Sequence, residues 1–377
     1  MKTMLYITTI IVALNCAVFA YPPDPDNAAL LYYQSFLLCG QPDESMQTIL
    51  KEVIDGRANA NEKVEEYVAK YKQAIRLAIV ASSMPHCDWG LKYSDGLSME
   101  MPYLGHTKVV AYLILCDARI HAGKGDFRMA LEKCLAAQRM ARHHGDSTDV
   151  GYLVGNSISL KSSNCIQDIL SQMPADSEIL NWLGEELKSI DAMPFSDKAI
   201  IEKGASAFRI YLNKEKIKDL LQFPGFKLDS IKDADEEFFR QSISYWDNYI
   251  AGIMSALALP YPQAYPELER LQKEYITDAA KNPHATLTRA LAPVSEQIYN
   301  GSIVGRTNLN AIRTAIEIYK IIAQTGQLPD ELAAGSPKDL FSDKAFGYEK
   351  TTEGFILRCQ GKDLSKDETY EFKFKTK

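Results

Sequence analysis

The sequence NLNAIRTAIEIYK fills residues 308–320, and its apolar side chains recur at spacings of three and four residues. This spacing places Leu309, Ile312, Ile316 and Tyr319 on one stripe of an amphipathic α-helix. A helix with one apolar stripe needs a second element to bury it, and the residues that follow supply one.

The last forty residues change from helical to strand-like periodicity. Residues 345–349 and 354–359 are strand-like, residues 350–354 form the turn between them, and residues 369–374 alternate polar with aromatic side chains. We therefore expect residues 305–377 to form an α+β module in which the helix covers one face of a three-stranded antiparallel sheet. The sheet residues expected to meet the helix are Phe346, Tyr348, Phe355, Leu357, Phe372 and Phe374.

The order of this helix, GQLP at 326–329, PKDLF at 337–341 and a short β tail resembles the soluble part of type II secretion pseudopilins. Those proteins continue the helix into a hydrophobic assembly helix, and no segment of that kind precedes Asn308. The resemblance points to residues 361–368 as the place where pseudopilins hold calcium. Lys362 and Lys366 favour a solvated hairpin loop there instead, so no metal site is expected.

Residues 21–304 carry helical periodicity almost throughout and form the predicted α-helical domain. A long structured loop interrupts it at residues 84–105, which are rich in glycine and proline. Helices are expected at 27–39, 43–55, 61–83, 109–121, 127–143, 151–172, 176–190, 196–212, 235–258, 265–281 and 285–300.

One helical pair resembles a tetratricopeptide (TPR-like) hairpin. Its turn is Gly125-Asp126-Phe127, and small residues such as Ala118, Ala130, Cys134 and Ala137 would let the two helices approach closely. The spacing does not repeat at a fixed period, so the chain is predicted to be mainly α, as an irregular α-helical array. An ordinary all-helical globule remains the alternative.

Residues 1–20 have the pattern of a signal peptide. Lys2 is followed by an apolar run that ends in Ala17-Val18-Phe19-Ala20, so cleavage would leave Tyr21 first and the protein exported, either periplasmic or extracellular. The alternative is a retained membrane anchor. A formal net charge of -7 makes nucleic acid an unfavourable partner, because few counterions would be released on binding.

Six cysteines remain after the predicted cleavage. Cys116, Cys134 and Cys165 lie in helical patterns and are expected to be small buried apolar residues. Cys39 and Cys87 lie at helix ends, which makes them the candidates for a disulfide.

No nucleophile elbow, zinc-protease helix, phosphate loop or dinucleotide fingerprint is present, and no cofactor is expected. His143 and His144 are neighbours and cannot both face one ion from a helix, because successive side chains point about 100° apart. They are expected to be solvent-exposed at the end of a helix.

The densest polar and aromatic cluster is HCDWGLKYSDG at residues 86–96. Together with residues 164–170 it resembles uncharacterised exported bacterial proteins with this helical layout, a resemblance that implies no activity. The candidate ligand-binding residues are His86, Asp88, Trp89, Tyr93 and Asp95, which could stack a sugar ring or clamp a peptide. Alternatively Trp89 fills the core while Asp88 and Asp95 cap turns.

The sequence thus favours a non-catalytic binding or scaffold protein of the cell envelope with a protein or peptide partner. The alternative is an envelope hydrolase or carbohydrate-binding protein with its site around Trp89. A membrane partner follows only if residues 1–20 are retained.

Overall fold

The structure, a computed structural model, describes residues 24–145, 148–193, 196–220, 231, 234–292 and 295–376. It is mainly α-helical, with a small three-stranded antiparallel sheet near the C-terminus, as predicted. The predicted signal peptide lies outside the described residues. Within the described part of the chain, no helix has both the length and the apolar character needed to cross a membrane.

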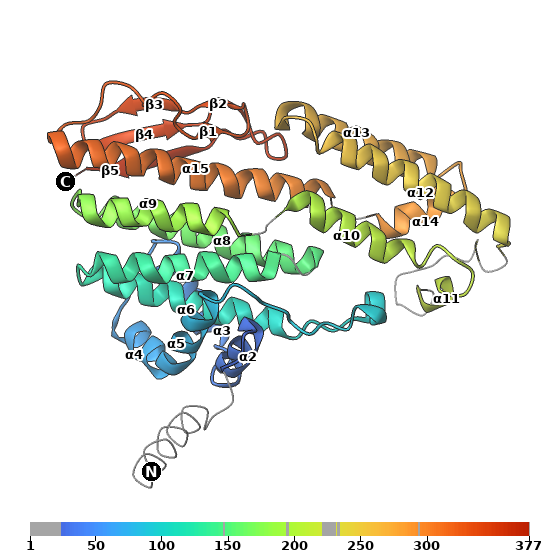
Figure 1. Cartoon of the computed structure of the whole chain (residues 1–377), viewed down its shortest axis with the longest axis horizontal. Coiled ribbons are helices and arrows are strands. Elements are labelled where there is room, and N and C mark those ends of the chain that lie inside the picture. Colours follow the sequence, from blue (N-terminus) through green and yellow to red (C-terminus); the bar gives the residue numbers. More distant parts are fainter. Residues whose placement is uncertain are drawn as a thin grey trace, which may run out of the picture.

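The first half of the chain stacks helices in successive rows (Figure 1). Side-chain oxygens of Asn27, Asp43 and Asn61 accept hydrogen bonds from the first turns of three of these helices and so fix where they begin. The helix predicted at 61–83 is divided in two at Tyr71. The helices are α2 (Ala28–Leu37), α3 (Glu44–Ile54), α4 (Glu62–Lys70), α5 (Lys72–Ser82), α6 (Tyr103–Gly123), α7 (Phe127–Gly145), α8 (Asp149–Leu170) and α9 (Ser177–Asp191).

Between α5 and α6 the predicted loop contains the short 3-10 helix η1 (Tyr93–Ser98). The predicted hairpin is formed by α6 and α7, which pack together across a turn in which Gly125 adopts a φ of 80°. That left-handed conformation favours glycine.

A second group of helices extends to one side of these rows, at the right of Figure 1. It has its own small core around Trp246, Phe239, Leu287 and Leu291. The group contains α10 (Asp197–Arg209), α11 (Ile217–Leu220), α12 (Glu236–Ala256), α13 (Tyr261–Asp278) and α14 (Ala285–Leu291).

The helix predicted at 308–320 is part of one long helix, α15 (Ser295–Thr325). The prediction of a separate helix at 285–300 was therefore wrong. The helix that begins at Ala285 ends at Leu291, and residue 300 lies inside α15. The boundary expected between residues 304 and 305 falls inside α15. The helical part and the C-terminal module consequently share this helix.

The predicted strands are present as β3 (Gly347–Lys350), β4 (Gly354–Arg358) and β5 (Glu371–Lys375). They form an antiparallel sheet in the order β3-β4-β5, in which Phe355 pairs with Phe374 and Leu357 pairs with Phe372. A two-residue ladder between β1 (Lys338–Asp339) and β2 (Lys344–Ala345) was not predicted from the sequence.

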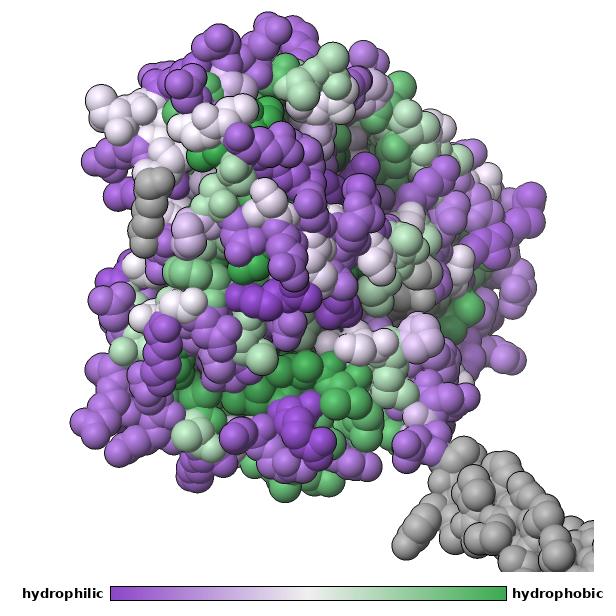
Figure 2. All heavy atoms as spheres, turned by 60° about the vertical axis from the view of Figure 1, so that its left-hand side comes forward, coloured by the Kyte–Doolittle hydropathy of each residue, from purple (hydrophilic) through white to green (hydrophobic). Residues whose placement is uncertain are grey.

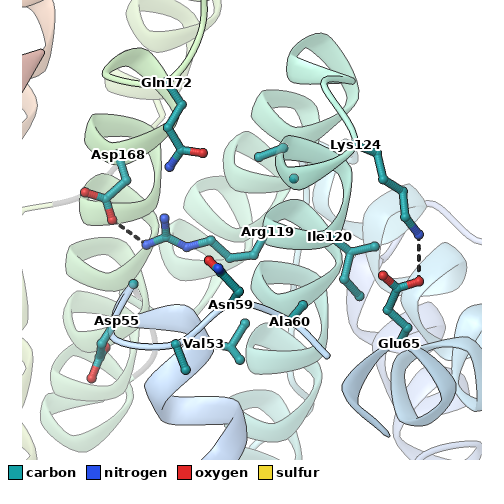
Figure 3. A pocket seen from close by; sticks show the side chains of 14 residues that line it. Val53, Asp55, Asn59, Ala60, Glu65, Arg119, Ile120, Lys124, Asp168 and Gln172 are labelled. Carbon is teal, nitrogen blue, oxygen red and sulfur yellow. Dashed lines mark hydrogen bonds and ion pairs between the residues drawn. The ribbon is translucent and has the colours of Figure 1, made fainter. Parts of the chain in front are cut away.

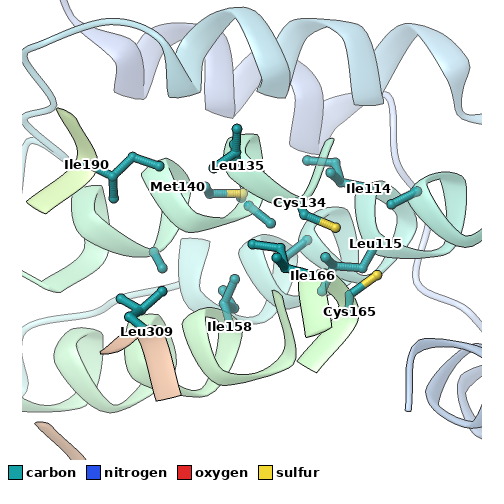
Figure 4. Packing of buried hydrophobic residues seen from close by; sticks show 14 of the residues in the cluster. Ile114, Leu115, Cys134, Leu135, Met140, Ile158, Cys165, Ile166, Ile190 and Leu309 are labelled. Atoms are coloured by element: carbon teal, nitrogen blue, oxygen red, sulfur yellow. The ribbon is translucent and has the colours of Figure 1, made fainter. Parts of the chain in front are cut away.

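α15 is buried on opposite sides, which the single predicted stripe did not reveal. Tyr319 faces the sheet, where its hydroxyl donates to the Lys375 carbonyl at 2.6 Å and its ring contacts Phe355. Leu309 lies beside Ile158 of α8 in Figure 4, and the Ile316 side chain lies next to Gly184 of α9. The prediction that the whole stripe covers the sheet was therefore wrong, because α15 is also packed against α8 and α9.

Glycines allow α8 to approach its neighbours closely. A Cβ at Gly155 would lie 2.5 Å from the Ala141 carbonyl oxygen of α7, so only glycine fits there without a shift of the backbone. Gly301 and Gly305 of α15 enclose the Asn156 side chain. A Cβ added at Gly301 would lie 2.8 Å from Asn156 Nδ2, and one added at Gly305 would lie 2.9 Å from Asn156 Oδ1. The resulting core is continuous from Ala28 in α2 to Phe374 in β5.

We predict that Ile316→Ala lowers the free energy of unfolding of the whole chain by about 2–5 kcal/mol, because Ile316 is 1% exposed in this continuous core. Chemical denaturation followed by circular dichroism measures the change. Glu317→Ala is the control, since the Glu317 side chain is 57% exposed and its loss should change stability by about 0.5 kcal/mol or less. Unfolding of the C-terminal module alone, with the other helices retained, would contradict the prediction.

Candidate functional site

The predicted ligand residues around Trp89 lie in different environments. Trp89 is 5% exposed, and its indole nitrogen donates to the His143 carbonyl at 2.9 Å. Stacked rings of Tyr103 and His144 lie with centroids 4.3 and 4.4 Å from the Trp89 ring, and Tyr32 stacks at 5.4 Å. Trp89 thus fills the core, as the structural alternative expects.

The polar members of this loop serve local structure or face solvent. Asp88 accepts a hydrogen bond from the Gly90 backbone at 2.9 Å, which is an Asx turn, and Asp95 pairs with Lys92 at 2.7 Å. His86 is exposed, and Tyr93 is 58% exposed. Ligand binding at this loop stays a prediction, and the geometry gives it no support.

Cys39 and Cys87 are both free thiols in the structure. Burial raises the pKa of Cys39 to about 11 and that of Cys87 to about 12, so both are protonated at neutral pH. The disulfide between them stays a prediction.

The expectation that His143 and His144 are exposed was wrong. They are 8% and 0% exposed, because α7 continues to Gly145 and its last turn is covered by Trp89 and Tyr103. Burial lowers the pKa of His143 to about 4 and that of His144 to about 3. Both rings are therefore neutral at pH 7.

The loop at 361–368 is held by its own hydrogen bonds. Asp363 is fully buried and accepts from the Ser365 backbone, the Ser365 hydroxyl and the Tyr370 hydroxyl. Asp367 pairs with Lys362 at 2.9 Å. In the described part of the chain, no three His, Cys, Asp or Glu side chains are grouped so that they could hold a metal ion.

A polar pocket of about 530 Å³ lies where the ends of α3, α6 and α8 meet the loop that leads to α4 (Figure 3). Its volume is in the range of sites that bind small molecules. Figure 2 brings this end of the molecule forward and shows hydrophilic side chains over most of it, with a hydrophobic area in the lower half.

Arg119 of α6 lies at the centre of this pocket, and its side chain is only 9% exposed. Its Nη2 donates to the Ile54 carbonyl at 2.7 Å and to Asp168 Oδ2 at 2.6 Å. Ile54 ends α3, where a cation is favoured by the unpaired carbonyls of the helix. Arg119 Nε is buried and has no acceptor among the described residues, a state that costs on the order of 1–3 kcal/mol.

Gly56 makes room for the Arg119–Asp168 ion pair. It follows the end of α3 with a φ of 68°, and the Arg57 backbone donates to the Glu52 carbonyl at 2.9 Å, as in a Schellman motif. A Cβ at Gly56 would lie 2.9 Å from Asp168 Oδ2. The helix ending that favours glycine also lets the α3–α4 loop lie against the ion pair.

Further charges surround Arg119 in opposite pairs. Lys124 pairs with Glu65 at 2.7 Å on the side of the pocket opposite Asp168 (Figure 3). Asp55 pairs with Lys161 at 2.8 Å. The side-chain amides of Asn59 and Gln172 complete the polar lining.

The lining of the pocket offers paired charges and side-chain amides. Among the described residues that line the pocket there is no His, Cys, Ser, Thr or Tyr, and each of its carboxylates is in an ion pair. A nucleophile activated by a neighbouring base, as covalent catalysis needs, is therefore missing from this set.

Sequence reasoning missed this site, although one signal was available. Arg119 follows a strongly apolar run in the predicted helix that corresponds to α6. A charged residue so close to a buried run is rarely buried itself unless it has a partner. Its partners Ile54 and Asp168 are 65 and 49 residues away in the chain. Only the packed structure brings them together.

We predict that the protein loses stability as the pH falls below about 6.5, the ordinary pKa of histidine. The lowered pKa values of His143 and His144 mean that the unfolded chain binds protons more readily than the folded one in this range. The contribution of the two histidines is fully present well above pH 6.5 and should fall by on the order of 1–2 kcal/mol for each histidine by pH 5. Asp149, whose pKa burial raises to about 6, offsets part of this loss.

Urea denaturation at pH 7.5, 6 and 5 measures this slope. His144→Phe keeps a ring between Trp89 and Tyr103 but cannot bind a proton, so it should reduce the slope. Equal slopes for this variant and the natural chain would show that His144 does not carry the effect.

Comparison of the chain with protein-family models, curated proteins and solved structures gave no match. The functional conclusion therefore rests on the geometry of the site.

Proposed function

We propose that this chain is a non-catalytic binding protein of the cell envelope and that the pocket around Arg119 is its ligand site. One observation carries the proposal. A guanidinium that is nine-tenths buried lines a pocket large enough for a small molecule, and its Nε lacks an acceptor. A ligand with an anionic group would be attracted by the positive charge of this guanidinium, which lines the pocket.

The location of the pocket also supports a binding role. It lies at an end of the helical rows, where α3, α6 and α8 are fixed by the continuous core. Binding groups on such rigid elements are held in place before the ligand arrives, which reduces the entropy lost on binding. The rival site around Trp89 has no comparable support, because neighbouring rings stack on the indole.

The resemblance of residues 305–377 to the soluble part of pseudopilins is part of the same proposal. A helix beside a three-stranded antiparallel sheet is in keeping with it. In this chain that helix, α15, also packs against α8, α9, α10 and α13. We therefore assign the module a scaffold role, in which it covers the helical array.

The proposed location in the envelope rests on the pattern of residues 1–20. We predict that protein recovered from the envelope fraction of producing bacteria begins at Tyr21. Amino-terminal sequencing together with intact-mass measurement decides this. A chain that retains Met1 would favour the membrane-anchor alternative, and recovery from the cytosol alone would refute export.

We predict that Gly123→Phe abolishes ligand binding without unfolding the protein. Gly123 lines the pocket at the end of α6, and a Cβ there meets no atom within 4 Å, so the new ring would fill the pocket. Gly105→Phe is the matched control, since Gly105 lies in the same helix with equally open space and does not line the pocket.

Thermal unfolding of the three proteins is measured with amino acids, tripeptides, maltotriose and inorganic phosphate. At least one compound should raise the melting temperature of the natural chain and of Gly105→Phe by a few degrees, and should leave Gly123→Phe unchanged. The proposal fails if no compound stabilises the natural chain or if all three proteins respond equally.

A further inference from the structure

We infer that the ligand of the Arg119 pocket is a short peptide with a free amino group and a free carboxylate. This inference rests on the proposed function and adds the chemical class of the ligand. It follows from the balance of charges in the pocket, from their placement on two sides, and from the kinds of side chain in the lining.

The charges of the pocket are nearly balanced. The lining contains the cations Arg119 and Lys124 and the anions Asp55, Glu65 and Asp168, and Asp55 is paired with Lys161 and Arg57 from outside the lining. A polyanion such as a nucleotide or a sugar phosphate would meet about as much repulsion as attraction here. A ligand with one charge of each sign fits this balance.

The charges are also separated in space. In Figure 3 Asp168 lies on one side of the pocket and the pair of Lys124 with Glu65 on the other, with Arg119 between them. A carboxylate in the pocket would be attracted by the guanidinium of Arg119, which lines it. The ammonium group at the other end of the ligand then faces Glu65, where it competes with Lys124 for the carboxylate.

The remaining lining matches a peptide chain better than a sugar. Asn59 and Gln172 each offer an amide donor and acceptor, which are the complements of a peptide group. Ala58 and Ala60 offer small apolar surface for side chains. None of the described lining residues has an aromatic ring on which a sugar could stack.

The test uses an equimolar mixture of unmodified tripeptides and the same mixture with the amino ends acetylated, with the carboxyl ends amidated, or with both ends blocked. Calorimetric titration into the natural chain, Gly105→Phe and Gly123→Phe gives the affinities. Unmodified tripeptides should bind the first two proteins and not Gly123→Phe. Blocking the carboxyl end should weaken binding by about tenfold or more, because it removes a charge-assisted hydrogen bond. Blocking the amino end should weaken binding by about two- to fivefold, as for an exposed ion pair.

A variant locates the amino end. Glu65→Gln removes a charge from a side chain that is 43% exposed, so the fold should be kept. It should weaken binding of unmodified tripeptides by about two- to fivefold, as for an exposed ion pair. Binding of the acetylated mixture should not change between this variant and the natural chain.

The outcomes separate the two proposals. Suppose that maltotriose or inorganic phosphate binds, that Gly123→Phe abolishes this binding, and that tripeptides do not bind. The pocket is then supported as the ligand site, and the peptide inference is overturned. Equal affinity for free and blocked tripeptides overturns it as well. If Gly123→Phe abolishes binding of none of these probes, both proposals fail.

Discussion

The close approach of α8 to α7 and α15 fixes how the main layers of the molecule are placed. Gly155 lets the backbone of α7 come near, and Gly301 and Gly305 accept Asn156 between them. Because these contacts involve backbone and one fixed side chain, they leave little freedom in how the three helices are placed. α15 is then buried between the helical rows and the sheet, which joins the C-terminal module to the same core.

This arrangement also creates the pocket. α6 and α8 end at the same side of the molecule as α3, so the free carbonyl of Ile54 and the carboxylate of Asp168 both reach Arg119. Desolvation opposes the charge of Arg119, while Cys165 and Asp168 favour it, and the net effect on its pKa is upward. The guanidinium therefore remains cationic although it is largely removed from water.

The two clusters that draw attention in the sequence and in the structure have opposite characters. The Trp89 cluster is aromatic, closed and stabilised by stacked rings, so its residues contribute to folding. The Arg119 cluster is charged and lines a pocket, and the Nε of Arg119 has no hydrogen-bond acceptor among the described residues. This unpaired donor lowers the free energy of unfolding. An arrangement that costs stability is more often functional than one that contributes to it.

Most of the local structure could be predicted from the order of the residues. Three- and four-residue apolar spacing located most helices, and two-residue alternation located β3 to β5, because these periods follow from backbone geometry alone. The tertiary structure decided which face of α15 meets the sheet, that His143 and His144 are buried, and that Ile54, Arg119 and Asp168 share a pocket. These features join residues far apart in the chain, and their contacts depend on how the helices pack, which local periodicity does not specify.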